Sequence, residues 1–152
     1  MTEAAATLPV EMRDLLDGTD LEDKVGETFL LLTVGPNGFP RVALLSVGEL
    51  YAPSADEVRL ALWRNSTTTQ SLTTQGRATL GYFSAGNVMY VALEARRVRD
   101  ADGLALFTAR VASVRRDEVE FAEILSGVRY RLRDPASVLP RWRRAIDALR
   151  AL

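Results

Sequence analysis

The chain has 152 residues, of which 47% are hydrophobic and 26% charged, and its formal net charge at pH 7 is −1. This size and composition predict one globular domain over residues 1–152, and the balanced charge gives no reason to expect nucleic acid as a partner. The chain has no cysteine and no histidine. Disulfides, thiolate chemistry and Ser–His–Asp catalysis are therefore excluded, and we expect no metal site.

No apolar run approaches the ~20 residues that a membrane-spanning helix needs. The first residues, MTEAAATLP, lack the basic and then apolar order of a signal peptide, so we expect a cytoplasmic protein with no membrane contact. Residues 1–7 are expected to form a flexible tail. LPVEMRDLLDG, residues 8–18, predicts a short helix that begins near Pro9 and stops at Gly18.

Strands are predicted from residue 28 onward. TFLLLTV, residues 28–34, is a continuous apolar and β-branched run, which is typical of a buried strand. GPNGFP predicts a hairpin turn, and RVALLSVGELY, residues 41–51, predicts the returning strand. VRLALW, residues 58–63, alternates between two faces. Further strands are predicted in residues 78–83, 87–100 and 105–117.

Helical segments interrupt and end this series. STTTQSLTTQG predicts a short helix that starts near Ser66 and ends before Gly76. Residues 119–125 predict a helical turn or two, and residues 127–133 predict a strand with three arginines on one face, Arg129, Arg131 and Arg133. Residues 137–152 predict an amphipathic helix. The whole pattern is mainly β, and we expect a six-stranded antiparallel barrel, closed or partly closed, with flanking helices.

Ser66, Thr67, Thr68 and Thr69 form a row of hydroxyl groups at the start of the middle helix. Two interpretations are open. In the first, Ser66 is an N-cap and the threonines lie on an exposed turn without a further role. In the second, the row binds an anion together with the free N–H groups of the helix start.

Residues 24–100 resemble the pyridoxamine-phosphate-oxidase-like split β-barrel family, a group of FMN-binding proteins. Asn37-Gly38-Phe39-Pro40 is similar to that family's turn after the first strand, and Arg41 matches the arginine of its flavin-lining strand. Ser66 matches the serine of the family's Ser-Arg-Lys-like segment, which binds the FMN phosphate, and Leu72 matches the leucine that follows.

The resemblance implies a split barrel that pairs with a second copy, with FMN at the interface of this homodimer and residues of both chains at each site. The segments LLLTV and VALLSV are too apolar to leave a broad face of the sheet in water, and a dimer would bury that face. From the resemblance, together with the hydroxyl row and the residues beside it, we expect the cofactor-binding residues to be Arg41, Val42, Ala43, Leu44, Ser46, Trp63, Arg64, Ser66, Thr67, Thr68 and Thr69.

The sequence departs from the family's pattern where the phosphate binds. Thr67 and Thr68 stand where the family has Arg and Lys, so two cations are missing, and Arg64 or Arg41 is expected to replace them. Trp63 either packs against a flavin ring or fills the end of the core. Ser46 either bonds the flavin edge or bonds the backbone inside the barrel.

The resemblance implies an FMN-dependent oxidoreductase with an unknown small-molecule substrate. No residue of the sequence stands out as a catalytic acid or base, so we expect the flavin to carry the chemistry. The three arginines of residues 127–133 form either a solvated face or a rim that attracts an anionic substrate. The alternatives are a relative that binds F420 or haem, and a degenerate dimeric barrel without catalytic activity.

Overall fold

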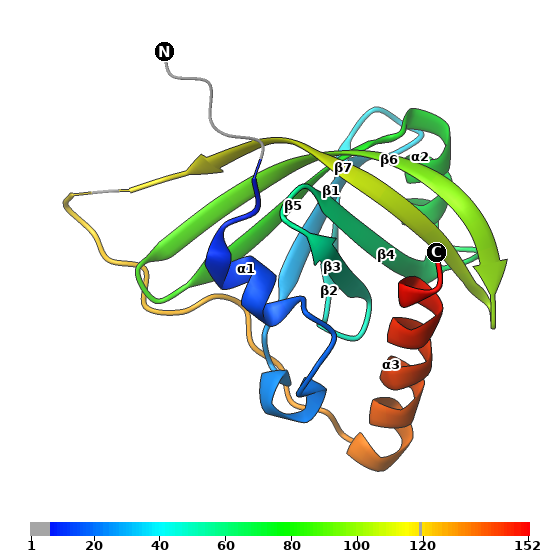
Figure 1. The fold of residues 1–152 in the computed structure, drawn as a ribbon. Helices are drawn as coiled ribbons and strands as arrows, with labels where there is room; N and C mark the ends of the chain where they lie inside the picture. Colours follow the sequence, from blue (N-terminus) through cyan, green and yellow to red (C-terminus); the bar gives the residue numbers. More distant parts are fainter. Residues whose placement is uncertain (1–6, 119) are drawn as a thin grey trace.

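The computed structural model describes residues 7–118 and 120–152, and seven strands form one antiparallel sheet there (Figure 1). The strands are β1 (Phe29–Val34), β2 (Pro40–Leu45), β3 (Leu50–Ser54), β4 (Glu57–Trp63), β5 (Arg77–Ser84), β6 (Asn87–Ala101) and β7 (Leu104–Arg116). Their order in the sheet is β2-β1-β5-β6-β7-β4-β3. The two edge strands, β2 and β3, are joined by residues 46–49 alone, so the sheet has to curl until its edges meet. This confirms the predicted mainly β split barrel.

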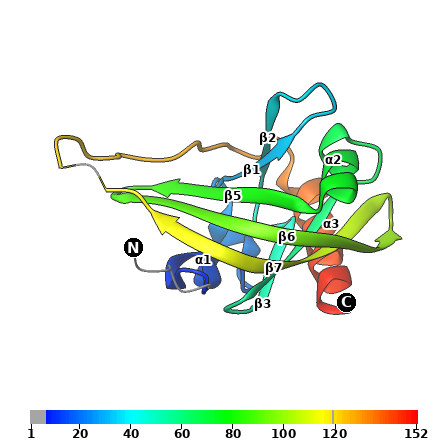
Figure 2. The ribbon, with the colours of Figure 1, turned by 90° about the horizontal axis from the view of Figure 1, so that it is seen from above.

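Four helical segments flank the sheet, α1 (Val10–Leu15), η1 (Leu21–Lys24), α2 (Thr67–Gln75) and α3 (Pro135–Arg150). Figure 2 shows α2 and α3 at the same end of the sheet. The predicted first helix is shorter than expected, and the last helix starts two residues earlier, where Asp134 accepts a hydrogen bond from the Ser137 N–H. Residues 1–6 of the predicted tail lie outside the described residues. No helix in the described part of the chain is long and apolar enough to cross a bilayer.

The barrel has seven strands rather than six because the predicted strand 41–51 is interrupted. Ser46 turns the chain, and its carbonyl accepts a hydrogen bond from the Glu49 N–H at 3.2 Å. The Ser46 hydroxyl accepts another from the Gly48 N–H at 3.2 Å. The indole of Trp142 on α3 packs directly on Gly48, where a Cβ would lie 2.0 Å from the ring. Apolar residues flank the turn at Leu45 and Leu50 and Val47 lies within it, which is why the sequence predicts one strand.

The predictions for residues 119–125 and 127–133 are wrong in the part that the structure describes, since residues 120–134 contain no helix and no strand. Residue 119 itself lies outside the described residues. The alternation of 127–133 has another cause, because Tyr130 and Leu132 pack against the core while the arginines point to solvent. Gly127 passes so close to β5 that a Cβ would lie 2.1 Å from the Phe83 carbonyl oxygen, and this contact holds the segment as an extended connection.

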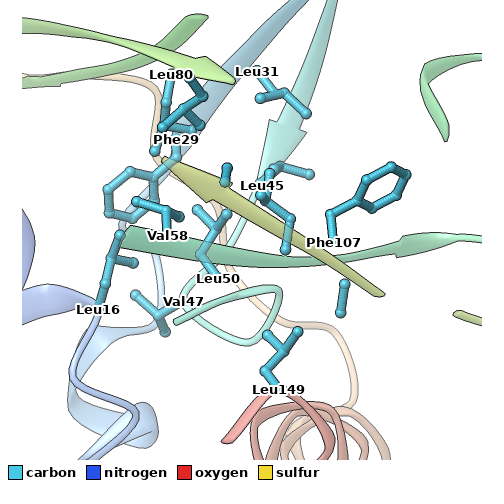
Figure 3. Packing of buried hydrophobic residues seen from close by; sticks show 14 of the residues in the cluster. Leu16, Phe29, Leu31, Leu45, Val47, Leu50, Val58, Leu80, Phe107 and Leu149 are labelled. Carbon is cyan, nitrogen blue, oxygen red and sulfur yellow. The ribbon is translucent and has the colours of Figure 1, made fainter. Parts of the chain in front are cut away.

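The core is one cluster of buried side chains from the strands and the flanking helices (Figure 3). Phe29, Leu50 and Phe107 are fully buried in its centre, and the Phe29 ring stacks on Tyr82 with centroids 4.9 Å apart. Leu149 of α3 and Leu16 at the end of α1 join the same cluster, so both terminal helices are anchored by apolar burial.

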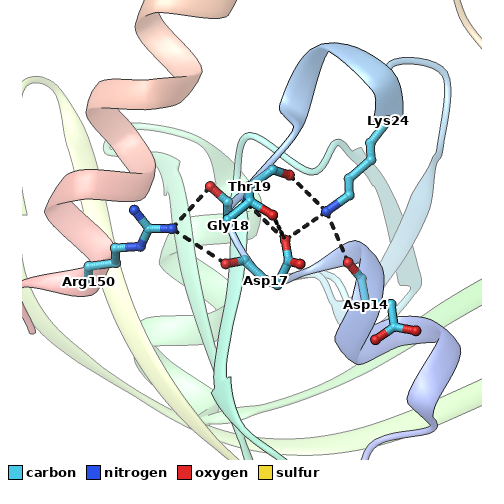
Figure 4. Close-up of polar contacts among 6 residues, drawn as sticks. All are labelled: Asp14, Asp17, Gly18, Thr19, Lys24 and Arg150. Carbon is cyan, nitrogen blue, oxygen red and sulfur yellow. Dashed lines mark hydrogen bonds and ion pairs between the residues drawn. The ribbon is translucent and has the colours of Figure 1, made fainter.

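Polar contacts tie the chain between α1 and η1 to the end of α3 (Figure 4). Lys24 Nζ donates to Asp17 Oδ1 at 2.7 Å and to the Asp14 and Thr19 carbonyls at 2.9 and 2.8 Å. Arg150 Nη2 donates to the Gly18 carbonyl at 3.2 Å. Lys24 thus holds the chain between α1 and η1 together, and Arg150 ties the C-terminal end of α3 to it.

Gly48→Ala is expected to lower the free energy of unfolding by roughly 1–3 kcal/mol, because the added methyl group overlaps the Trp142 ring and one of the two has to move. Urea unfolding measures this loss. In a Trp142→Leu background the same substitution should cost clearly less. An equal cost in both backgrounds would show that the clash with Trp142 is not its cause.

Candidate functional site

A pocket of about 340 Å³ lies where β2, β4, the start of α2 and α3 meet. This volume is in the range of small-molecule sites. The strands supply apolar walls and α3 supplies both apolar and charged ones. The lining residues are Ala43, Leu44, Leu45, Gly48, Glu49, Ala61, Leu62, Trp63, Ser66, Thr68, Ala101, Asp102, Leu104, Arg141, Trp142, Arg144, Ala145 and Ala148.

Five residues predicted to bind a cofactor line this pocket, namely Ala43, Leu44, Trp63, Ser66 and Thr68. Trp63 is 59% exposed, so it does not fill the end of the core. The other six predicted residues, Arg41, Val42, Ser46, Arg64, Thr67 and Thr69, are outside the lining.

Those six residues have distinct places. Arg41 is exposed on β2 and lies against Gly35 of the hairpin turn, and Val42 is exposed on the outer face of the same strand. Arg64 is exposed beside the β6–β7 turn, where its N–H donates to the Gly103 carbonyl at 3.0 Å. Ser46 is buried next to the pocket in the turn after β2.

The hydroxyl row divides into capping and pocket-facing groups. Ser66 Oγ accepts from the Thr69 N–H at 3.1 Å and so caps α2. Thr69 is fully buried, and its hydroxyl donates to the Trp63 carbonyl at 2.6 Å. Thr68 faces the pocket, and the N–H groups of Thr67 and Thr68 stand in the first turn, where no intrahelical acceptor is available. The helix start therefore presents a hydroxyl group and N–H donors next to the pocket.

Two arginines of α3 bring positive charge to this pocket, which the sequence analysis did not anticipate. Arg141 and Arg144 are three residues apart, on the helix face that also carries Ala145 and Ala148 into the lining. The guanidinium carbon of Arg141 lies 5.4 Å from the centroid of the Trp63 ring, a cation–π contact. The contact between Arg141 and Trp63 could not be predicted because the two residues are far apart in the sequence. The i, i+3, i+4, i+7 spacing of the α3 lining residues does indicate that they share one face of the predicted helix.

Glu49 is a further lining residue that was not predicted from the sequence. It ends the turn after β2, and its carboxyl accepts hydrogen bonds from the Ser46 hydroxyl at 3.1 Å and the Ser46 N–H at 3.4 Å. Burial raises the pKa of this carboxyl to about 7, against the opposing effects of the Ser46 hydrogen bonds and the charge of Arg141. Glu49 therefore changes charge near neutral pH, although the sequence offered no evident acid or base.

The raised pKa of Glu49 predicts a pH-dependent stability. The folded state binds the Glu49 proton more tightly than the unfolded state does. The contribution of this group to the free energy of unfolding is therefore fully present below about pH 4.5 and is lost as the pH rises to about 7. Glu49→Gln should remove this loss and stabilise the protein at pH 8 by an amount on the order of 2–3 kcal/mol. Urea unfolding of both proteins at pH 5 and pH 8 measures it. A variant whose stability relative to the wild type is the same at both pH values would contradict the prediction.

No family model matches the sequence. The chain is 36% identical over 141 residues to the uncharacterized protein YclD of Bacillus subtilis, and the match covers 90% of this chain and 92% of YclD.

Solved structures share the fold at low sequence identity. One is provisionally assigned as a pyridoxamine 5'-phosphate oxidase from Lactobacillus delbrueckii, with a TM-score of 0.57 and 13% identity, covering 75% of this chain and 98% of that one. Another is an FMN-binding protein from Syntrophomonas wolfei, with a TM-score of 0.53 and 14% identity, covering 72% and 90%. The chain therefore belongs to the family of YclD, and its fold is the split β-barrel of the pyridoxamine 5'-phosphate oxidase-like FMN-binding proteins.

Proposed function

We propose that the protein binds FMN in this pocket and serves as an FMN-dependent oxidoreductase for a small-molecule substrate. The observation that carries the proposal is the position of the α2 start and the two α3 arginines on one pocket with otherwise largely apolar walls. An amphiphilic ligand with a flat ring at one end and a phosphate at the other suits such a pocket. The FMN-binding neighbour from Syntrophomonas wolfei supports this choice of ligand.

The phosphate is placed at the start of α2. Thr68 offers its hydroxyl group, and the first-turn N–H groups and the helix dipole favour an anion. Arg141 and Arg144 supply the cations that the family's Arg-Lys pair supplies elsewhere. In this proposal, Arg64 and Arg41 are not needed to neutralise the phosphate, and Ser66 contributes by capping the start of α2.

The ring is placed between β2 and β4. Ala43 and Leu44 provide apolar contacts along one wall, and Trp63 provides an aromatic face at the other. FMN, when bound, supplies hydride and electron transfer. The chain itself binds and orients the ring and keeps water from its buried side.

A homodimer completes the proposed site. Leu30, Leu32 and Val34 of β1 pair with Leu44, Val42 and Pro40 of β2, and their side chains share the outer face of the sheet. Val42 and Leu44 are 55% and 59% exposed there, which leaves an apolar patch next to the pocket. A second copy that covers this face would bury the patch and close the open side of the pocket.

FMN is expected to bind more tightly than riboflavin, which has the same ring and no phosphate. Arg144→Gln removes a charge-assisted bond worth roughly 1.5–3 kcal/mol, so the affinity for FMN should fall about tenfold or more while riboflavin binding changes little. Quenching of flavin fluorescence on titration measures both affinities. F420 is titrated in parallel, and tighter binding of F420 than of FMN would mean that F420 is the cofactor.

Arg143→Gln is the matched control for this titration. Arg143 stands next to Arg144 on α3 but points away from the pocket and pairs with Glu22 at 3.3 Å. Its substitution removes the same charge from the same helix and should leave FMN binding unchanged. Equal losses in both variants would mean that only the overall charge matters, and no binding of any flavin would favour a degenerate dimeric barrel without catalytic activity.

The dimer is tested by light scattering, which should give twice the chain mass of 16.7 kDa. Val42→Glu places a charge in the apolar outer face and should give a monomer. Val98→Glu is the control, because Val98 is 40% exposed on β6 and belongs to another part of the surface. A wild-type protein that is monomeric at micromolar concentration would refute the shared site.

A further inference from the structure

Glu49 is a half-buried acid that the proposed binding of FMN does not use. It lines the pocket, while its carboxyl is held by two hydrogen bonds from Ser46. Its backbone is equally fixed, since the Glu49 carbonyl accepts from the Ala61 N–H of β4 at 2.8 Å. The carboxyl group therefore has one defined position in the wall of the pocket.

Charged and titratable groups surround this carboxyl. Arg141 of α3 acts on it electrostatically, and Arg144 of α3 and Asp102 of the β6–β7 turn line the same pocket. Tyr130, from the segment before α3, lies next to Ser46, and its buried hydroxyl has no hydrogen-bond partner among the described residues. Burial and the negative charge of Glu49 raise the pKa of the Tyr130 hydroxyl, so Tyr130 stays neutral and Glu49 is the group that titrates.

We propose that Glu49 is a proton-linked gate for anion binding, whose carboxylate form attracts Arg141 across the pocket and whose protonated form leaves the charge of Arg141 to the phosphate of the ligand. The proposal rests on the proposed function of the pocket. Binding of the anion above neutral pH then takes one proton from the solvent. That proton forms an O–H bond on the Glu49 carboxylate, whose charge changes from −1 to 0.

The electrostatic reason is competition for one cation. A carboxylate and a phosphate in the same partly buried pocket repel each other, and both are attracted to Arg141. Protonation of Glu49 removes the repulsion and the competition together. A surface carboxylate with an ordinary pKa would stay charged, whereas the burial of Glu49 places its proton exchange near neutral pH.

The test is FMN affinity as a function of pH in a buffer without phosphate. With a gate that opens on protonation, wild-type affinity should fall at least tenfold between pH 7 and pH 9. Glu49→Gln mimics the protonated carboxyl and should bind FMN at pH 9 as tightly as at pH 7. The second ionisation of the FMN phosphate, near pH 6, adds negative charge as the pH rises and acts in the opposite direction, so it does not imitate this fall.

Two further measurements separate the gate from a structural role. Ser46→Ala removes a hydrogen bond to the charged carboxyl and should move the transition in FMN affinity to higher pH. Calorimetry at pH 8 in two buffers of different ionisation enthalpy should show uptake of about one proton for the wild type and none for Glu49→Gln. Glu94→Gln is the control, since Glu94 pairs with Arg110 away from this pocket and should behave as the wild type does.

Wild-type affinity that does not change between pH 7 and pH 9, or an unchanged pH dependence in Glu49→Gln, would overturn the gate and leave the proposed FMN site intact. FMN that fails to bind at any pH would overturn both. Riboflavin distinguishes the phosphate from the ring, because the gate acts through Arg141 and riboflavin affinity should vary much less with pH.

Discussion

The packing of Trp142 on Gly48 is the contact on which the rest of the site depends. The indole occupies the space that any side chain at residue 48 would need, so α3 is seated on the turn that joins the two edge strands of the sheet. This turn closes the barrel, and the helix that covers it becomes a wall of the pocket. The same contact between Trp142 and Gly48 therefore covers the turn that closes the barrel and positions α3 in the wall of the pocket.

The position of α3 also explains how the pocket is charged. Once Trp142 and Leu149 are buried, the helical repeat directs Arg141 and Arg144 toward the pocket and Arg143 toward Glu22. The same turn carries Ser46 and Glu49, so positive and titratable groups face each other across a small volume. In this account, the loss of the family's Arg-Lys pair at Thr67 and Thr68 is balanced by a helix far away in the sequence.

Local patterns in the sequence were sufficient to predict the mainly β fold and the start of α2. The family resemblance added the split barrel and a set of cofactor-binding residues, of which Ala43, Leu44, Trp63, Ser66 and Thr68 line the pocket. Local patterns failed where tertiary contacts decide. The turn at Ser46–Glu49 interrupts an apolar run because Trp142 packs there, and residues 127–133 alternate without joining a ladder. Arg141, Arg144 and Glu49 were missed because the pocket brings together residues that lie almost a hundred positions apart in the sequence. Glu49 in particular has an ordinary sequence context, and only burial changes its chemistry.

Binding of FMN between β2, β4 and α3, with its phosphate at the start of α2, is best tested by a crystal structure of the protein with FMN, grown at pH 6 without phosphate or sulfate. We expect the phosphate within hydrogen-bond distance of Thr68 and of an arginine of α3, with the ring beside Trp63. Flavin bound elsewhere, or a phosphate that contacts neither α2 nor α3, would contradict it.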